Sequence, residues 1–259
     1  MDPVDHRSVY AWRESITLAG IRKSPCVVGN IEKHGNGVYS IDLIPERHIP
    51  VFRPGQFLHL ALDEYDPSGF WPDSRAFSIA SSPSDRSKIK IAYSVKGKFT
   101  TRMENELAKG RRVWIKLPYG EFIIEGENNV VLVAGGTGIT AFSAFLEGLS
   151  SDINQTISLF YGARNENLLL YNDMLKNVSK RVKNFQINYA LETKPTLNTL
   201  NGFPTRIGAL SVEWVWKSLE NPAKAVFFLS GPPPMLKRFS ADLRSYEVPD
   251  NQIRIDAWE

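Results

Sequence analysis

The sequence predicts two domains: an antiparallel six-stranded β-barrel, followed by an α/β domain with a doubly wound parallel sheet. Residues 26–123 contain short segments of alternating apolar and polar side chains, separated by turn residues, which is typical of antiparallel strands. From residue 128 onward, short apolar strands alternate with helical stretches, which is the βαβ pattern of an open parallel sheet. A length of 259 residues is sufficient for two domains that each bury a core.

Six strands and one helix are expected in the first half. CVVGNIEK and VYSIDLIP flank the turn cluster HGNG, which indicates a hairpin. The helix is expected in TTRMENELAK, with Thr100 or Thr101 as its N-cap and Gly110 at its end. Closely spaced strands with mixed turns favour a small barrel. The expected strands are residues 26–33, 38–45, 56–62, 75–81, 88–95 and 111–117.

The second half is expected to alternate strands with helices on both faces of the sheet. We expect strands at residues 130–134, 156–162, 185–191, 225–231 and 252–258, and helices within 140–149, 167–178 and 233–245.

The polar segment Glu125–Asn129 separates the two patterns. We therefore expect a barrel domain of residues 25–125 and an α/β domain of residues 126–259. Residues 1–24 would form a separate N-terminal arm. In that arm Val9, Trp12, Ile16 and Ala19 fall at helical spacing, which indicates a short amphipathic helix with a packing role.

Composition excludes several classes of protein. Hydrophobic content of 42% and charged content of 23% are ordinary for a globular protein. No apolar stretch approaches the roughly 20 residues needed to cross a bilayer, and MDPVDHRSVY does not resemble a secretory signal, so we expect a cytoplasmic protein without a membrane span. Cys26 is the only cysteine and the four histidines lie far apart, so no metal site is expected.

Charge is unevenly distributed along the chain. A net charge of +3 is too small to indicate nucleic-acid binding. Between Lys88 and Lys116, however, nine Lys or Arg residues face only Glu104 and Glu106. This basic segment is either a solvated face or a surface for phosphates or an acidic protein partner.

The loop GGTGIT at 135–140 follows the first strand of the second half and opens a helix. Its glycines allow backbone amides to approach a ligand, and a helix N-terminus favours negative charge, so the loop suits a pyrophosphate. The spacing G-G-x-G differs from the dinucleotide fingerprint G-x-G-x-x-G, and Arg164 follows the second strand where a carboxylate is usual. Alone, the loop is also compatible with a tight structural turn.

A second loop, SGPPPM at 230–235, ends the AVFFLSG strand and opens another helix. Prolines suit the first turn of a helix, where a missing amide hydrogen costs little. In a doubly wound sheet this strand and the VVLVA strand are expected to be neighbours. Both loops are therefore expected to line one crevice at the carboxyl ends of the strands.

The chain resembles the ferredoxin–NADP reductase superfamily, whose members have a flavin-binding barrel followed by a pyridine-nucleotide domain. The resemblance covers roughly residues 26–258 and depends on motifs that occur in the family's order across both halves. These motifs are FRPGQF at 52–57, RAFSIASSP at 75–83, VKGKFT at 95–100, LPYGEF at 117–122, GGTGIT at 135–140 and SGPPPM at 230–235.

The resemblance implies a site for FAD in the first half. Arg75 would bind a flavin phosphate, Phe77 would lie against the isoalloxazine ring, and Ser78 would donate a hydrogen bond to flavin N5, the atom that accepts hydride. Relatives often have Tyr at the position of Phe77. VKGKFT resembles the family's phosphate loop, which adds Val95, Gly97, Phe99 and Thr100 as cofactor-binding candidates.

The resemblance also implies a site for NAD(P)H in the second half. Ser230 occupies the position beside the nicotinamide where many relatives have Cys, and Trp258 stands where relatives keep an aromatic residue over the flavin. We treat Ser78, Ser230 and Trp258 as catalytic candidates, although Trp258 could equally be a packing residue. The nucleotide-binding candidates are Gly135, Gly136, Thr137, Gly138, Arg164, Gly231, Pro232 and Met235.

The resemblance predicts a monomeric flavoprotein reductase. Hydride would pass from NAD(P)H to bound FAD, and electrons would then pass to an acidic redox protein such as a ferredoxin, a flavodoxin or an oxygenase component, or to a small electron acceptor. Two alternatives stay open. One is a reductase of free flavin or ferric complexes, and the other is a non-catalytic electron-transfer or nucleotide-sensing subunit.

Overall fold

The computed structural model describes residues 20–125, 127–195, 200 and 202–256. The chain divides into two compact units, with a break between Ile123 and Ile124. The segment Thr140–Gly148 groups with the first unit. The domain boundaries expected from the sequence stay a prediction, and the expected helix of the N-terminal arm lies outside the described residues.

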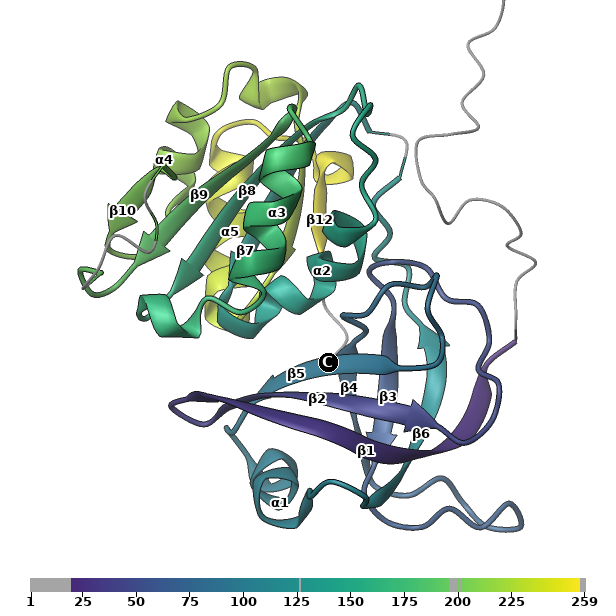
Figure 1. Ribbon diagram of the computed structural model, residues 1–259. Helices are drawn as coiled ribbons and strands as arrows, with labels where there is room; N and C mark the ends of the chain where they lie inside the picture. The colour runs from purple at the N-terminus through teal and green to yellow at the C-terminus, as the bar shows by residue number, and fades with distance from the viewer. Residues whose placement is uncertain (1–19, 126, 196–199, 201, 257–259) are drawn as a thin grey trace, which may run out of the picture. The chain divides into compact units, whose positions relative to one another are not determined.

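The first unit is an antiparallel six-stranded barrel, as predicted (Figure 1). Its strands lie in the order β4-β3-β6-β1-β2-β5, and each neighbouring pair in this order is antiparallel. The strands are β1 (Arg22–Gly35), β2 (Val38–Pro45), β3 (Phe57–Ala61), β4 (Ser74–Ser78), β5 (Ile89–Ser94) and β6 (Arg112–Tyr119).

The predicted hairpin joins β1 to β2. Asn36 and Gly37 at its turn have φ of 51° and 69°, the left-handed conformation that tight hairpin turns require. Strand β1 begins at Arg22, earlier than the expected start at Cys26. The early residues pair with the end of β6, since Lys23 lies opposite Lys116 and Pro25 opposite Trp114. Their polar side chains and the proline hid this part of the strand in the sequence.

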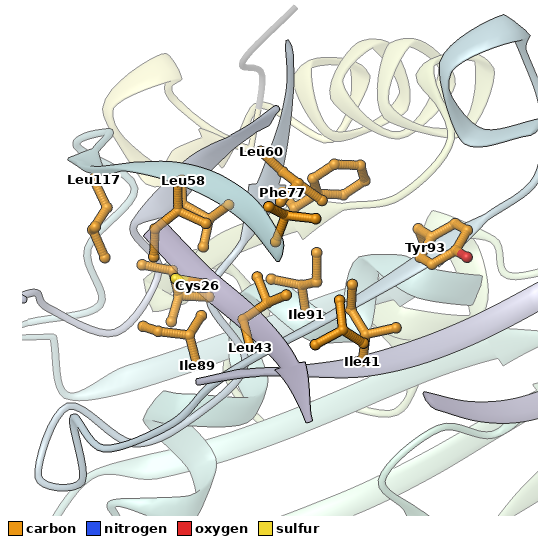
Figure 2. Packing of buried hydrophobic residues seen from close by; sticks show 14 of the residues in the cluster. Cys26, Ile41, Leu43, Leu58, Leu60, Phe77, Ile89, Ile91, Tyr93 and Leu117 are labelled. Carbon is orange, nitrogen blue, oxygen red and sulfur yellow. The ribbon is translucent and has the colours of Figure 1, made fainter. Parts of the chain in front are cut away.

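Side chains from all six strands fill the barrel interior (Figure 2). Cys26, Leu43, Leu58 and Ile91 are completely or almost completely buried there. Burial raises the pKa of the Cys26 thiol far above its ordinary value, so this cysteine is an apolar packing residue rather than a thiolate.

Helix α1 (Lys98–Glu106) follows β5, and its ends differ from those expected. Its N-cap is Gly97, which makes Thr100 the third helical residue rather than the cap. It ends at Glu106, and the amide of Leu107 donates to the carbonyl of Met103. Gly110 lies in the turn that follows, with φ of 88°.

The second unit contains a parallel six-stranded sheet in the order β10-β9-β8-β7-β11-β12. Five strands match the expected ones: β7 (Asn129–Gly135), β8 (Thr156–Ala163), β9 (Phe185–Leu191), β11 (Val226–Ser230) and β12 (Ile253–Ile255). The edge strand β10 (Thr205–Ile207) was not predicted, because its three residues are all exposed and carry no apolar pattern.

Helices cover both faces of this sheet, which confirms the doubly wound prediction. Helix α3 (Asn172–Arg181) lies in front of the sheet in Figure 1 and α5 (Pro233–Ser245) behind it. The short helix α4 (Val212–Lys217), which the sequence analysis missed, packs with α5 against the face formed by Val131 and Phe227.

The remaining helical segments are short. They are η1 (Gly136–Ile139), α2 (Thr140–Glu147), η2 (Glu166–Leu168), η4 (Pro222–Lys224) and η5 (Asp250–Gln252). In the part of the chain that the structure describes, no helix has the length and apolar character that a membrane crossing needs.

Candidate functional site

A hydroxyl without a hydrogen-bond partner among the described residues lies at the end of β4. Ser78 is only 6% exposed, and its side chain forms no hydrogen bond with any described residue. It lies opposite Phe57 of β3 in the antiparallel register. The hydroxyl oxygen itself keeps contact with solvent, so this position is open to a ligand that supplies a hydrogen-bond partner.

Arg75 stands on the same strand and reaches the start of α1. Its Nη1 donates to Asp73 Oδ1 at 3.1 Å and to the carbonyl of Ser74 at 2.8 Å, and the side chain is more than half exposed. Its guanidinium carbon is 5.4 Å from the ring centroid of Phe99, the second residue of α1. A guanidinium beside a helix N-terminus, where the first amides lack acceptors, favours an anion such as a phosphate.

Thr100, in the first turn of α1, accepts hydrogen bonds from part of the backbone of the preceding loop. Thr100 Oγ1 accepts hydrogen bonds from the amides of Lys96 at 2.9 Å and Gly97 at 3.1 Å. These two amides therefore already have an acceptor. The amides of Lys98 and Phe99, at the first two helical positions, have no acceptor inside the helix and are the ones available to an anion.

Phe77 belongs to the barrel core. It is 7% exposed, and its ring lies edge-on to Tyr93 with the centroids 6.3 Å apart (Figure 2). Val95 packs against the same core, and its amide donates to the carbonyl of Gly37 at 2.8 Å. These contacts hold in place the part of the barrel that lies beside Ser78. The role of Phe77 against a flavin stays a prediction.

In the second unit, the two loops expected to line one crevice are in direct contact. Strands β7 and β11 are neighbours, with Ala134 opposite Ser230. A Cβ on Gly138 would lie 2.5 Å from the carbonyl carbon of Ser230 and 2.7 Å from the amide nitrogen of Gly231. The glycine is therefore required by the packing of one loop on the other, in addition to any ligand.

Gly135 makes the other close approach. A Cβ at this position would lie 2.6 Å from Met235 Sδ and 2.9 Å from Pro232 Cδ. Gly136 and Thr137 lie between the two close approaches in η1, and Gly136 has φ of 54°. The GGTGIT segment thus begins with a turn of 3-10 helix, and α2 starts only at Thr140.

Ser230 is held by a carboxylate that the sequence analysis missed. Its Oγ donates to Asp256 Oδ2 at 2.8 Å, and the two residues are 3% and 8% exposed. The amide of Asp256 in turn donates to the carbonyl of Leu229 at 2.9 Å, just past the end of β12. The sequence signal was an aspartate after the apolar segment IRI, but only the pairing of β11 with β12 brings it to Ser230.

Two exposed residues of opposite charge, Arg164 and Glu192, follow the carboxyl ends of β8 and β9. The carbonyl of Arg164 accepts from the amide of Thr193 at 3.1 Å, and the amide of Glu192 donates to the carbonyl of Ala163 at 3.2 Å. Arg164 was expected here from the sequence. Glu192 was missed because it follows the third strand rather than the second.

Most of the basic segment between Lys88 and Lys116 is engaged in ion pairs. This favours the solvated-face interpretation for these residues, and it leaves Lys96, Lys98, Lys109 and Lys116 without an ion pair among the described residues. The pairs are Lys88 and Lys90 with Asp42, Arg102 with Asp63 and Glu106, Arg111 with Glu106, and Arg112 with Glu46.

The third catalytic candidate, Trp258, lies outside the described residues, so its role stays a prediction.

Among the residues that the structure describes, no group of three or more His, Cys, Asp or Glu side chains is arranged to hold a metal ion.

Residues 132–240 match the family model of the oxidoreductase NAD-binding domain. The chain is 25% identical to the anthranilate 1,2-dioxygenase electron transfer component of Acinetobacter baylyi over 96% of this chain and 69% of that protein. It is 29% identical to the phenol 2-monooxygenase reductase component of a Pseudomonas species, and 26% identical to the propane 2-monooxygenase reductase component of Mycolicibacterium goodii. These two alignments cover 84% and 80% of this chain but only 64% and 59% of the relatives.

Solved structures share the fold. A ferredoxin reductase in carbazole 1,9a-dioxygenase has a TM-score of 0.71 at 21% identity, over 94% of this chain and 71% of that one. The cytochrome b5 reductase domain of Ulva prolifera nitrate reductase also has a TM-score of 0.71, at 18% identity, over 90% of this chain and 97% of that one. The architecture of a barrel followed by a parallel sheet is thus common to them and to this chain.

We expect Gly138→Ala to destabilise the protein, because its Cβ would displace the backbone of Ser230. The free energy of unfolding should fall by about 1–3 kcal/mol, the usual cost of overpacking, as measured by denaturant unfolding. Gly69→Ala is the control, since its Cβ would lie no closer than 3.6 Å to a neighbour. Equal stability of the two variants would show that the two loops do not pack as described.

Proposed function

Since the chain belongs to the ferredoxin–NADP reductase superfamily, we propose that it is an NAD(P)H-dependent flavoprotein reductase. It transfers hydride from NAD(P)H to bound FAD and passes electrons to a redox protein. The observation that carries the proposal is the hydroxyl of Ser78, which has no partner among the described residues and lies on the strand that also carries Arg75.

The barrel unit has the groups that FAD needs. Arg75 and the amides of Lys98 and Phe99 would hold the phosphates, because positive charge and free backbone donors meet there. Thr100 and Gly97 keep that loop in shape through their mutual hydrogen bonds. Bound FAD would supply the ring atom that accepts hydride.

Ser78 would form a hydrogen bond with that ring atom. Its hydroxyl would donate to flavin N5 and hold the ring in one orientation on the barrel wall formed by Phe77 and Val95. A donor fixed before the reaction stabilises charge as it develops, because the protein need not reorganise.

In the α/β unit, the loops around Gly136, Thr137 and Gly231 would bind the nucleotide's pyrophosphate and nicotinamide ends. Ser230 stands at the carboxyl end of β11, where parallel sheets bind ligands. The carboxylate of Asp256 accepts a hydrogen bond from the Ser230 hydroxyl and so fixes the direction of its O–H. The lone pairs of the Ser230 oxygen would then accept a hydrogen bond from the nicotinamide amide. Asp256 is thus a positioning residue.

Relatives support a protein as electron acceptor. Three of them are named as reductase or electron transfer components of oxygenases. We infer that this chain acts as a cytoplasmic monomer and delivers electrons to a separate, acidic redox protein.

Flavin content tests this function. Purified protein, reconstituted with excess FAD or FMN and then desalted, should retain about one flavin per chain, with FAD preferred because the α1 site suits a pyrophosphate. Anaerobic NAD(P)H should then bleach the visible flavin absorbance. Protein that retains neither flavin contradicts the proposal, and protein whose flavin no nucleotide reduces supports the non-catalytic alternative instead.

Ser78→Ala should retain FAD and slow its reduction by NAD(P)H by roughly 10²-fold, the usual effect of losing one positioned donor. The Arg75 contact to the phosphates stays in place, so flavin affinity should change little. Stopped-flow absorbance gives the rate. The control is Ser74→Ala on the same strand, whose hydroxyl accepts from Trp71 Nε1. Reduction of the Ser78 variant at the wild-type rate would refute the role of this hydroxyl.

Arg164 and Glu192 should have opposite effects on nucleotide choice. Arg164→Ala should lower the ratio of NADPH to NADH efficiency about tenfold, because it removes a cation that can bind the 2′-phosphate. Glu192→Gln should raise the same ratio, because it removes a carboxylate that repels the phosphate and can bind a ribose hydroxyl. Steady-state kcat/KM for both nucleotides measures the ratio, with Lys180→Ala on α3 as control. An unaltered ratio in Arg164→Ala would show that Arg164 does not bind the 2′-phosphate.

A further inference from the structure

Three side chains that can carry positive charge stand in a lateral row across the barrel. In the antiparallel register His59 of β3 lies opposite Lys116 of β6, and Lys116 lies opposite Lys23 of β1. Residues directly opposite one another share one face of a sheet. Like charges in such positions destabilise the pair unless something else compensates them.

No carboxylate among the described residues compensates the two lysines. Lys23 Nζ donates to Tyr65 Oη at 2.6 Å and lies 4.3 Å from the centroid of that ring. Lys116 Nζ lies 5.5 Å from the centroid of Tyr119 and 6.0 Å from that of Trp71. Neither lysine forms an ion pair within the described chain.

Three carboxylates of the same unit have other partners. Glu46 makes two 2.8 Å bonds to Arg112, which is also on β6, and Asp63 pairs with Arg102. Asp66 accepts from the amide and the hydroxyl of Ser68. Burial lowers the pKa of the His59 imidazole below its ordinary value, and the positive charge of Lys116 lowers this pKa further.

Aromatic rings frame the row. The Tyr119 ring lies 4.9 Å from His59, and Tyr65 lies 5.3 Å from Trp71. Phe70, next to Trp71, is 100% exposed. These rings range from buried (Tyr65) through half-buried (Trp71 and Tyr119) to fully exposed (Phe70). Aromatic side chains with cations beside them are typical of the central residues of protein–protein interfaces. We call Lys23, His59, Tyr65, Phe70, Trp71, Lys116 and Tyr119 together the lysine–aromatic surface.

This surface begins close to the proposed flavin site. Phe57 lies opposite Ser78, its ring stacks 5.6 Å from Tyr119, and His59 is two residues along the same strand. At about 3.3 Å per residue, the row of charges lies roughly 7 Å along β3 from the position that faces Ser78. A protein bound there has its redox centre near the flavin.

We propose that the lysine–aromatic surface is the docking site of the acidic redox protein that takes electrons from this reductase. This inference rests on the proposed function. Carboxylates of the partner would pair with Lys23 and Lys116, and apolar groups would cover Phe70 and Trp71. The two lysines would attract the acidic partner and so raise its rate of association, because their charges are not neutralised within the described chain.

The test reverses both charges in the full FAD-loaded chain. Lys23→Glu/Lys116→Glu should lower kcat/KM about tenfold or more for a plant-type [2Fe–2S] ferredoxin and for a flavodoxin, two acidic probes, at low ionic strength. For wild-type protein this kcat/KM should fall as salt rises, and for the variant it should not. Cytochrome c, a basic acceptor, should show no such loss. Lys23→Gln/Lys116→Gln should give an intermediate loss.

Lys33→Glu/Lys109→Glu is the matched control, because it changes net charge equally at two exposed lysines outside this surface. The proposal is overturned if both double reversals behave alike, or if wild-type protein reduces neither acidic probe. The rate of flavin reduction by NAD(P)H, measured without acceptor, separates the two ideas. If that reduction is normal while ferredoxin kinetics are unaffected by the reversal, only the docking site is wrong. If wild-type flavin is not reduced, the proposed function itself fails.

Discussion

The close approach of backbone at the carboxyl ends of β7 and β11 is the constraint on which the α/β unit depends. A Cβ on Gly138 would collide with the backbone of Ser230, and one on Gly135 would collide with Met235 and Pro232. Because the two strands are neighbours in a parallel sheet, their loops must share the space above them. The same approach lets Asp256, at the end of β12, hold the hydroxyl of Ser230. The neighbouring strands β7, β11 and β12 therefore position the loops and the Ser230 hydroxyl of the proposed nucleotide site.

In the barrel unit, some polar groups lack hydrogen-bond partners at positions where a cofactor would supply them. The Ser78 hydroxyl has no partner in the described chain, and the first amides of α1 lie beside the guanidinium of Arg75. Other charges of the barrel are paired, as with Arg112 and Glu46. Groups left unpaired are candidates for ligand binding, and the same reasoning identifies Lys23 and Lys116 on the outer face.

Local sequence patterns predicted the strands and loops whose formation depends on residues close together in the sequence. Apolar runs interrupted by glycine identified β7, β11 and the adjacency of their loops, and alternation identified the barrel strands. Tertiary pairing decided the rest. Asp256 becomes a partner of Ser230 only through the register of β11 with β12, and Lys23 becomes a neighbour of Lys116 only because β1 extends through Pro25. The ion pairs that occupy most of the basic segment link residues far apart in sequence, so charge counting overstated that surface.

Direct hydride transfer between nucleotide and flavin is the central claim, and one measurement tests it most directly. FAD-loaded protein is mixed anaerobically with NADH or NADPH carrying deuterium at the transferred C4 position, and the visible flavin absorbance is followed in a stopped-flow instrument. The account predicts that one equivalent of nucleotide bleaches one flavin, and that the deuterated nucleotide reacts more slowly. Flavin that stays oxidised while nucleotide is demonstrably bound would contradict the account.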